Sequence, residues 1–290
     1  MSLLTLIVNP TAGNGYALKM EEPIRQELEK RGVAHTILRT EYPGHATALA
    51  RQAAQRADCT GVVSVGGDGT AFEVACGLMG TDAPLGVIPA GTGNDFVKTV
   101  GIPRKPMAAL EKILSGAPRP VDVGSMNDRL FLNVCGTGFD VTVLDYTVEA
   151  KKYVRGILPY LVGLVRAIAH YKPVHVRMEA DGQIQERDVL ICSVANGRFI
   201  GGGIPICPEA APDDGLLDLV VVETRPQWMI PFYLPGLLMG KVLTFGVTSH
   251  CRCRKVEIVS PGMRLNVDGE ILSLDAASFA VQPGRLMLYW

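Results

Sequence analysis

The sequence lacks the features that mark several classes of protein. Lysine and arginine number 28 against 29 aspartates and glutamates, a net charge of −1, which argues against a nucleic-acid-binding protein because such proteins need a large cationic surplus. The seven cysteines are scattered and form no Cys-x-x-Cys pair. Their spacing argues against a disulfide scaffold or a zinc site and predicts free thiols in a reducing compartment.

Long apolar runs are missing as well. No run reaches the ~18 residues that span a bilayer, and the apolar N-terminus has neither a cationic start nor a small-residue cleavage site. We therefore expect a cytoplasmic protein whose first residues form a buried strand. The mean hydropathy of +0.21 is nevertheless high, so contact with the inner face of a membrane or with an apolar substrate stays open.

The first 120 residues alternate between apolar strands and amphipathic helices. Strands are predicted at residues 3–8, 33–38, 61–65 and 85–88, and helices at 17–31, 46–57 and 71–78. This alternation is typical of a doubly wound, mostly parallel α/β sheet. In such a sheet ligands bind at the carboxyl ends of the strands.

The pattern changes near residue 121. Short β-like segments follow at 130–134, 174–179, 189–195, 217–222, 255–259, 265–267 and 285–289, and they predict an antiparallel β-rich second domain. One long helix is predicted at 148–171, and residues 228–245 form a further apolar segment.

The strongest functional signal is the loop Gly66-Gly67-Asp68-Gly69-Thr70, directly after a predicted strand. Glycines expose backbone amides to a ligand, and the following helix directs its positive end there, so the loop favours a phosphate. Asp68 would repel a bare phosphate, which is explained if a divalent cation bridges the two. The alternative is an ordinary turn between a strand and a helix.

A second loop, Pro89 to Phe96, follows the next strand. Gly91 and Gly93 can expose amides, Thr92 can bond a phosphate, and Asp95 supplies a second carboxylate. Neighbouring parallel strands would bring both loops to one edge, where they predict a cleft for a polyphosphate and a metal ion. The P-loop pattern is absent, and so is Gly-x-Gly-x-x-Gly, which weakens a dinucleotide oxidoreductase interpretation.

A spaced set of motifs closely resembles the bacterial diacylglycerol kinase-like lipid kinases, which share their catalytic domain with diacylglycerol, sphingosine and ceramide kinases. The motifs cover nearly the whole chain: Asn9-Pro10-x-x-Gly13, Gly66-Gly-Asp-Gly-Thr70, Gly91-Thr-Gly-Asn-Asp95, Asp122-Val-Gly124, Asn196-Gly197, Gly201-Gly-Gly203, Pro208-x-Ala210-x-x-Asp213-Asp-Gly215-x-Leu-Asp218 and Asp268-Gly-Glu270. The resemblance implies a kinase that moves the γ-phosphoryl group of ATP to a lipid hydroxyl. Diacylglycerol, which would give phosphatidic acid, is one such acceptor.

The resemblance also implies the domain arrangement. A nucleotide-binding α/β domain would span residues 1–122, a β-sandwich lipid-substrate domain would span residues 123–284, and the last strand, residues 285–290, would return to the first domain. The active site would lie between the domains. Related enzymes are often dimers, so a homodimer is a further expectation.

Site residues are carried over from the family by position. The nucleotide would be held by Asn9, Pro10, Gly13, Thr40, Gly66, Gly67, Asp68, Gly69, Thr70, Ala71, Phe72, Gly91, Thr92 and Asn94. Asp68 and Asp95, with Asp122 through a water, would position the catalytic Mg²⁺. Glu270 would accept the hydroxyl proton, with Asp268 beside it. A separate structural cation would be bound by the Asp214 side chain and by the carbonyls of Ala211 and Leu216.

Simple chemistry supports these roles. Phosphoryl transfer requires mainly positioning and charge neutralisation, and a carboxylate that accepts the proton of an alcohol contributes ~10²–10⁴-fold. Without the resemblance, Asp268-Gly-Glu270 would be interpreted as a solvated hairpin turn. Two positions depart from the usual family pattern, because Ala12 replaces a serine and Phe72 replaces an asparagine.

Four further hypotheses remain. The basic, apolar stretch from Val148 to Lys172 could rest on anionic lipid, and residues 228–245 could line a lipid-access channel, although both could simply be packed. An NAD kinase shares the Gly-Gly-Asp-Gly motif, but the Gly91–Asp95 loop suits a lipid kinase better. A catalytically silent nucleotide- or lipid-binding regulator is favoured only by Ala12 and Phe72.

Overall fold

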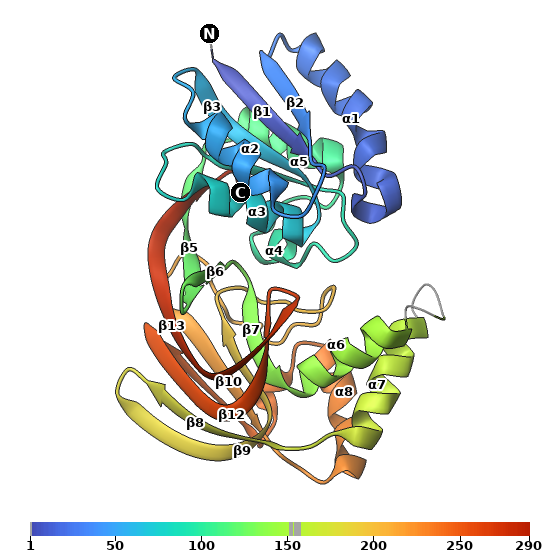
Figure 1. Ribbon diagram of the computed structural model, residues 1–290, viewed down its shortest axis with the longest axis vertical. Helices are drawn as coiled ribbons and strands as arrows, with labels where there is room; N and C mark the ends of the chain where they lie inside the picture. Colours follow the sequence, from blue (N-terminus) through green and yellow to red (C-terminus); the bar gives the residue numbers. More distant parts are fainter. Residues whose placement is uncertain (1, 151–152, 154–157) are drawn as a thin grey trace.

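The computed structural model describes residues 2–150, 153 and 158–290, which fold into two lobes (Figure 1). The first lobe is built on four parallel strands in the order β2-β1-β3-β4. Its elements are β1 (Leu3–Val8), α1 (Ala12–Lys30), β2 (His35–Arg39), α2 (His45–Ala54), β3 (Cys59–Gly66), α3 (Asp68–Leu78), β4 (Leu85–Pro89), α4 (Asp95–Thr99) and α5 (Pro106–Ser115). The predicted doubly wound α/β domain is confirmed.

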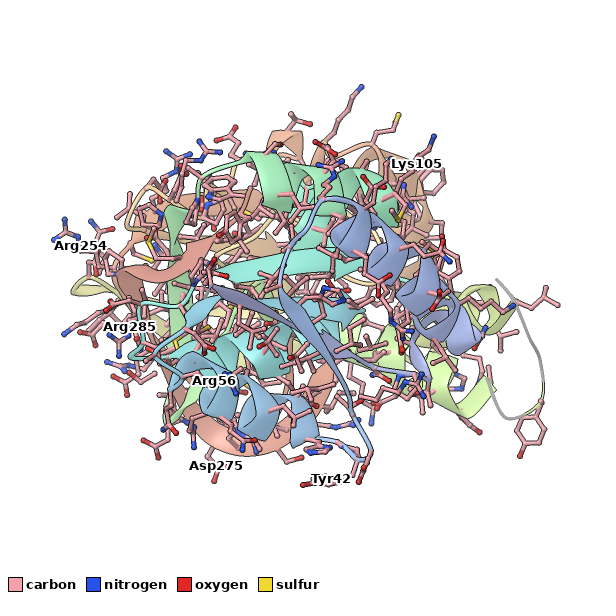
Figure 2. All side chains as sticks on the ribbon, turned by 90° about the horizontal axis from the view of Figure 1, so that it is seen from above. Tyr42, Arg56, Lys105, Arg254, Asp275 and Arg285 are labelled. Carbon is pink, nitrogen blue, oxygen red and sulfur yellow. The ribbon has the colours of Figure 1, made fainter. Side chains whose placement is uncertain are left out.

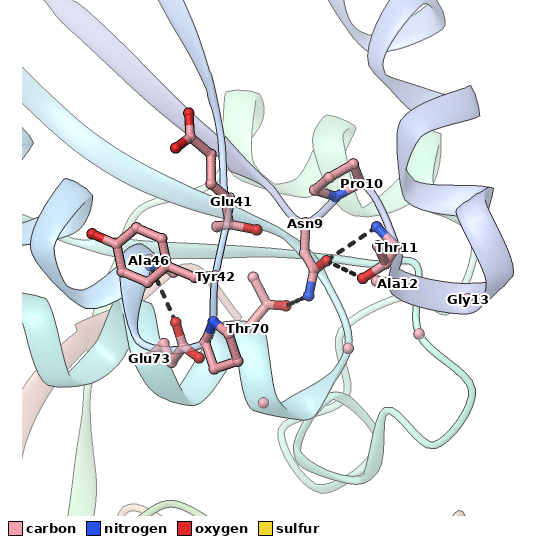
Figure 3. Close-up of a pocket in the computed structure, with 15 residues that line it drawn as sticks. Asn9, Pro10, Thr11, Ala12, Gly13, Glu41, Tyr42, Ala46, Thr70 and Glu73 are labelled. Atoms are coloured by element: carbon pink, nitrogen blue, oxygen red, sulfur yellow. Dashed lines mark hydrogen bonds between the residues drawn. The ribbon is translucent and has the colours of Figure 1, made fainter.

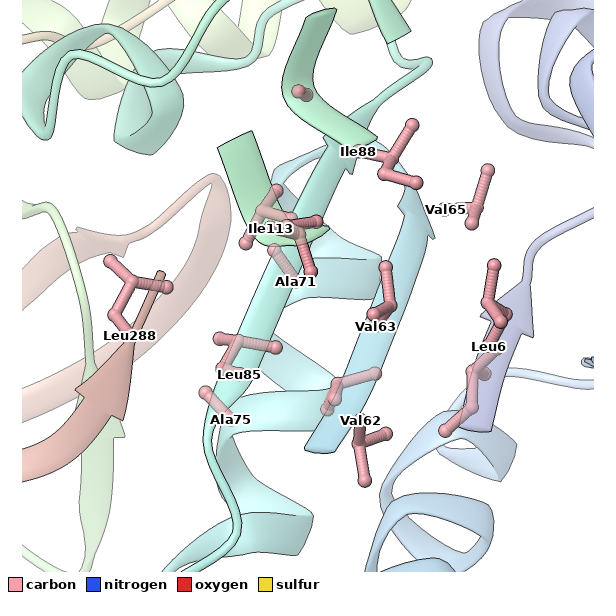
Figure 4. Packing of buried hydrophobic residues seen from close by; sticks show 14 of the residues in the cluster. Leu6, Val62, Val63, Val65, Ala71, Ala75, Leu85, Ile88, Ile113 and Leu288 are labelled. Atoms are coloured by element: carbon pink, nitrogen blue, oxygen red, sulfur yellow. The ribbon is translucent and has the colours of Figure 1, made fainter. Parts of the chain in front are cut away.

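The strands of the first lobe are apolar because they are covered on both faces. Helices α2 and α3 contact each other on one face of the sheet, and α1 and α5 contact each other on the other (Figure 1). Leu6, Val63, Ile88 and Ile113 are among the buried side chains that pack between these layers (Figure 4). Continuous apolar runs, rather than alternating ones, are typical of parallel strands buried in this way.

The second lobe is a β-sandwich with antiparallel pairing among the strands that the structure describes. Its strands are β5 (Arg119–Met126), β6 (Arg129–Phe131), β7 (Val134–Gly138), β8 (Val174–Ala180), β9 (Gln183–Ala195), β10 (Leu217–Glu223), β11 (Thr248–Cys253), β12 (Lys255–Val267) and β13 (Glu270–Leu288). The predicted antiparallel second domain is therefore confirmed. The two strands expected at 255–259 and 265–267 are one bent strand, β12.

Strand β13 joins the two lobes. It begins in the sandwich beside β12 and ends beside β4 in the first lobe, where Leu288 pairs with Leu85 in parallel (Figure 1). The strand expected at 285–289 is the end of this long strand. Val121 and Val123 of β5 also pack in the apolar cluster of the first lobe. The domain boundary at residue 122 stays a prediction.

The single long helix predicted at 148–171 is wrong. The chain forms two helices, α6 (Phe139–Ala150) and α7 (Leu158–His170), which pack against each other, and Tyr153 between them lies in a turn. A Cβ on Gly163 would lie 2.3 Å from Thr147 Oγ1, so the helices approach closely because residue 163 has no side chain. Lys151, Lys152 and Arg155, expected to be basic contacts, lie outside the described residues.

The apolar segment at 228–245 forms short helices. These are η1 (Gln227–Met229), α8 (Ile230–Leu238) and η2 (Val242–Thr244). Helices α6, α7 and α8 pack on one apolar cluster at the outer face of the sandwich (Figure 1). Within the described part of the chain, no helix is long and apolar enough to cross a membrane.

Candidate active site between two glycine loops

The two glycine loops meet at the edge of the parallel sheet. Strands β3 and β4 end side by side, with Gly66 paired to Pro89, and the amide of Ala90 donates to the Gly66 carbonyl at 2.7 Å. A Cβ on Gly91 would lie 2.3 Å from the Cα of Gly67. The two loops are therefore neighbours, as predicted. They can approach this closely because residue 91 has no side chain.

This contact predicts a stability effect. Replacing Gly91 with alanine would force the loop backbones apart and is expected to lower the free energy of unfolding by ~1–3 kcal/mol. The matched control is Gly69→Ala, because nothing lies within 4 Å of a Cβ at that position. Thermal unfolding should show a lower midpoint for Gly91→Ala than for Gly69→Ala, and equal midpoints would contradict the packing described.

A cavity of about 460 Å³ opens beside the loops (Figure 3). Asn9 organises it: its Oδ1 accepts from the amide and the hydroxyl of Thr11 at 3.1 and 2.9 Å, and its Nδ2 donates to Thr70 Oγ1 at 3.1 Å. The cavity is lined by residues 9–13, 40–43, Ala46, Gly67, Gly69, Thr70, Glu73 and Gly91. Most of the residues predicted to contact the nucleotide therefore line this one cavity.

Four residues in this region differ from what the motifs suggested. Phe72 and Ala71 pack against the apolar core rather than lining the cavity. The Thr11 hydroxyl donates to Asn9, so it does not simply replace the hydroxyl missing at Ala12. Glu73, which the sequence gave no role, accepts from the amides of Gly44 and Ala46 at 2.9 and 3.1 Å and so holds the start of α2 at the rim.

The cavity has the donors that a nucleotide phosphate requires. Helix α3 begins at Asp68, and its N-cap residue, Gly67, provides no side-chain cap. The amides of a first helical turn lack partners within the helix, and the helix dipole favours an anion there. The side-chain oxygen of Asn94 is buried without a hydrogen-bond partner. The residues present therefore fit a bound nucleotide.

Two carboxylates converge beside these amides. Oxygens of Asp68 and Asp95 lie 3.0 and 3.9 Å from the position of a Cβ on Gly93. Asp68 Oδ1 accepts from the amide of Phe96 at 3.1 Å, and no partner is described for its Oδ2. Burial raises the pKa of Asp68, the Phe96 amide opposes that shift, and the Asp95 carboxylate raises the pKa further. Two carboxylates that lie close together fit a divalent cation.

Lys98 is a site residue that the sequence motifs did not single out. Its Nζ lies 2.9 Å from Asp95 Oδ1 and is largely buried, while the amide of Gly202 donates to the other Asp95 oxygen at 2.8 Å. Gly202 belongs to the second lobe, so Asp95 connects the lobes. The signal for this ion pair in the sequence is the i, i+3 spacing of Asp95 and Lys98 on α4.

Asp268 lies at the tip of the β12–β13 hairpin and faces the first lobe. Its carboxylate accepts from the amides of Leu132, Asn133 and Val134 at 2.7–3.0 Å. Burial raises the pKa of Asp268 to about 6, those amides oppose the rise, and the charge of Asp68 adds to it. This charge effect of Asp68 on Asp268 agrees with the neighbourhood that the family motif implies, and the role of Asp268 in the site stays a prediction.

Glu270 lies two residues further on and is more exposed. Its side chain is 66% exposed, and its Oε2 accepts from Arg129 at 3.0 Å. No contact between Glu270 and Asp68 or Asp95 is described. Its role as proton acceptor stays a prediction, with Arg129 as a partner that the sequence did not reveal.

Asp122 is placed differently from the role expected for it. It is buried, and its two carboxylate oxygens accept from the amides of Gly215 and Gly284, both at 2.7 Å. These contacts tie β5 to the 207–216 loop and to β13. Among the described contacts, none leads from Asp122 to Asp68 or Asp95, so the geometry supports a bracing role at the lobe junction.

The predicted structural cation site lies on the same loop. Asp214 Oδ1 accepts from the Leu216 amide at 3.0 Å, and burial raises the pKa of Asp214, as do the charges of Asp218 and Asp122. The carboxylates of Asp122 on β5 and Asp218 on β10 thus repel the charge of Asp214 on the loop. No contact of the Ala211 or Leu216 carbonyl is described, and their role as ligands stays a prediction.

Asp140 is a buried carboxyl group that the sequence did not indicate. It opens α6 behind Gly136, where a Cβ would lie 2.6 Å from Asp140 Oδ2 and 3.1 Å from Ser193 Oγ. The Oδ1 of Asp140 and the Ser193 hydroxyl are buried without partners. Burial raises the pKa of Asp140 to about 6, although the amides of Val141 and Asp140 oppose this.

This burial predicts a pH-dependent stability. Between the ordinary pKa of 3.8 and about 6, the folded protein holds the Asp140 proton and the unfolded chain does not, so stability falls as the pH rises. Above that range the ionised group costs up to ~3 kcal/mol. Denaturation at about pH 4 and about pH 7.5 should show that Asp140→Asn gains stability relative to wild type only at the higher pH. An equal effect at both would contradict the shift.

Comparison with known proteins agrees with this geometry. Residues 3–126 match the model of the diacylglycerol kinase catalytic domain, and residues 133–290 match the YegS C-terminal NAD kinase beta sandwich-like domain. A diacylglycerol kinase of Bacillus subtilis strain 168 is 31% identical over 93% of this chain and 90% of its own length. A Pseudomonas putida protein named "Probable lipid kinase YegS-like" is 37% identical over 79% of this chain and 76% of its own length.

A solved structure has the same fold. The crystal structure of a candidate diacylglycerol kinase from Bacillus anthracis str. Sterne covers all of this chain and 96% of its own, with a TM-score of 0.79 and 26% identity. The fold and the matches define a kinase. The chain belongs to the diacylglycerol kinase-like family of lipid kinases. Its likeness to NAD kinase is confined to the description of one domain.

Proposed function

We propose that the protein transfers the γ-phosphoryl group of ATP to the hydroxyl of a membrane lipid, with Mg²⁺ as cofactor and diacylglycerol as acceptor, giving phosphatidic acid. The observation that carries this proposal is the convergence of Asp68 and Asp95 at Gly93, beside the uncapped start of α3. Amides for phosphates and carboxylates for a cation are the two requirements of phosphoryl transfer. The named relatives support the lipid as acceptor.

The roles of this chain's residues follow from their positions. The loop around Gly67 and Gly91 would bind the phosphates through amides, and Asn9 would fix the loop through Thr70. Asp68 and Asp95 would hold the cation, which neutralises phosphate charge when bound. Lys98 would supply a second positive charge. In the transfer, Glu270 would take the hydroxyl proton while the new O–P bond forms and the bond to the ADP oxygen breaks.

The kinase assay that tests this proposal uses labelled ATP with a panel of lipids and with NAD. We expect a labelled lipid in the presence of Mg²⁺ and none after chelation. Labelled NADP would instead identify an NAD kinase, and ATP binding without transfer to any acceptor would identify a silent regulator. Either result would overturn the proposed function. The homodimer stays a prediction, which a measurement of the molecular mass in solution would test.

A lipid kinase must reach its acceptor at a membrane, and the segment formed by η1 and α8 offers a surface for this contact. The side chains of Trp228, Phe232, Leu238 and Met239 are 63–75% exposed, and the rings of Trp228 and Phe232 pack edge to face at 6.4 Å. No charged residue lies between Ile230 and Leu238. The exposed aromatic residues Trp228 on η1 and Phe232 on the uncharged helix α8 fit the interfacial region of a bilayer.

This surface predicts a binding defect. The double variant Trp228→Ala/Phe232→Ala is expected to bind anionic vesicles at least ~10-fold more weakly, because two large apolar side chains no longer enter the lipid. Ile184→Ala is the control, since Ile184 is an exposed apolar residue on β9. The measurement is vesicle sedimentation, in which Ile184→Ala should bind like wild type. Wild-type binding by the double variant would contradict the proposal.

A further inference from the structure

A cluster of three metal-ligating side chains lies away from the proposed active site. Cys207, Asp218 and His250 each offer a ligand atom, and these atoms all lie within 4.8 Å of one another. Asp218 is on β10 and His250 on the adjacent strand β11, while Cys207 is on the loop that covers them. The cysteine spacing in the sequence gave no sign of such a site, because the ligands are brought together by the fold.

The cluster is held in place by rigid structure. Asp218 and His250 project from paired strands, with Asp218 opposite Arg252 and His250 opposite Val220. The amide of Cys207 donates to the Arg198 carbonyl at 3.2 Å, and the Arg198 side chain donates to the Ala210 carbonyl at 2.7 Å. Ligands on strands and on a loop that is bonded at both ends need little reorganisation to bind an ion.

The environment of the cluster suits a metal ion. Cys207 is fully buried, Asp218 is 1% exposed, and the side chain of His250 is 20% exposed, which leaves access from one side. Burial and the Asp218 charge raise the pKa of the Cys207 thiol, whereas the backbone amides of Ala210 and Glu209 lower it. The Ala210 amide donates to the Cys207 carbonyl at 3.2 Å, which fixes the backbone that carries this ligand.

The distances require only small adjustments. His250 Nε2 and Asp218 Oδ1 are joined by a hydrogen bond of 2.6 Å. Around a tetrahedral Zn²⁺ the ligand atoms lie about 3.3–3.8 Å apart, given bonds of ~2.0–2.3 Å. The His250–Asp218 pair would therefore open by ~0.7–1.2 Å, and the Cys207 sulfur lies within 4.8 Å of both ligand atoms. Arg252, whose Nε is 3.5 Å from Asp218 Oδ1, is partly exposed and can turn aside.

From this geometry we infer that Cys207, Asp218 and His250 form a site for Zn²⁺, with water as the fourth ligand. A thiolate, an imidazole and a carboxylate select Zn²⁺ over Mg²⁺ or Ca²⁺, which bind oxygen ligands. On binding, the Cys207 thiol releases its proton to water, and a neutral His250 carries its ring proton on Nδ1, which leaves the Nε2 lone pair free for the metal. This site differs from the predicted cation site of Ala211, Asp214 and Leu216 in all its ligands.

The site would brace the loop at residues 207–216 against β10 and β11. That loop also supplies Gly215, whose amide binds Asp122 at the lobe junction. An ion that binds only the folded protein raises its stability. We therefore expect Zn²⁺ to raise the unfolding midpoint of the metal-stripped, reduced protein.

The test uses the full chain, stripped of metal and kept reduced. Zn²⁺ titrated against a chromophoric chelator should bind as one equivalent, and Co²⁺ should give a thiolate-to-metal charge-transfer band. Cys207→Ser and His250→Gln should each weaken Zn²⁺ binding at least ~10²-fold and abolish the rise in unfolding midpoint. Cys251→Ser is the control, because Cys251 is an exposed thiol beside His250. It should bind Zn²⁺ like wild type.

Several results would overturn the inference. They are binding of less than one equivalent, a charge-transfer band that persists in Cys207→Ser, loss of binding in Cys251→Ser, and displacement of Zn²⁺ by an equal concentration of Mg²⁺. Retention of the native circular dichroism spectrum by Cys207→Ser and His250→Gln separates lost binding from lost folding. If either variant fails to fold, loss of the Co²⁺ band in Cys251→Ser would still assign the ligand to Cys251 and overturn the inference.

Discussion

Replacing Asp68 with asparagine is expected to lower the rate of lipid phosphorylation by at least ~10²-fold. Asparagine keeps the shape of the side chain but removes the charge that would hold the divalent cation beside Asp95. The remaining carboxylate, Asp95, is already bonded to Lys98 and to the Gly202 amide, so it cannot readily replace Asp68. The measurement is the initial rate of lipid phosphorylation at saturating ATP over a series of Mg²⁺ concentrations.

The matched control for this variant is Asp82→Asn, which removes an exposed aspartate in the loop between α3 and β4. It should phosphorylate lipid like wild type. Because burial raises the pKa of Asp68, the folded protein carries an energetic cost for that charge, and Asp68→Asn should not lower the unfolding midpoint. A variant that is stable and fully active would remove Asp68 from the catalytic site.

Glu270→Gln is expected to lower kcat by ~10²–10⁴-fold while leaving the KM for ATP within a few-fold of wild type. An amide can still bond Arg129 but cannot accept the proton of the lipid hydroxyl. The measurement is steady-state kinetics at varied ATP and saturating lipid. The separation of kcat from KM distinguishes a proton acceptor from a residue that binds the nucleotide.

The control for Glu270→Gln is Glu257→Gln, an exposed glutamate on the neighbouring strand β12. Its kinetics should match those of wild type. The exposure of Glu270 makes this test decisive, because a solvated residue of the hairpin could be dispensable. An unchanged kcat for Glu270→Gln would assign proton removal to another group.

Much of the fold could be predicted because local pattern and tertiary structure agree. The β-branched run at Val62, Val63 and Val65 is a buried central strand, and the glycines after it mark the turn into α3. The order of strands and helices then places the loops of Gly67 and Gly91 at one edge. These features depend on short stretches of chain, which is where sequence patterns are most informative.

What could not be predicted depends on contacts between distant segments. Helices α6 and α7 approach closely at Gly163, and an apolar run alone does not distinguish such a pair of helices from one long helix. The carboxylate of Asp122 is bonded to Gly215 and Gly284, which no spacing of motifs indicates. Cys207, Asp218 and His250 likewise come from three separate segments.

The most direct test is to incubate the protein with ATP, Mg²⁺ and a total bacterial lipid extract and to compare the phosphorylated lipids by mass spectrometry, with Asp68→Asn as the reference. The account predicts that a phosphomonoester lipid accumulates with wild type alone and disappears when the metal is chelated. Identical lipid profiles for the two proteins, with ATP bound by wild type, would contradict it.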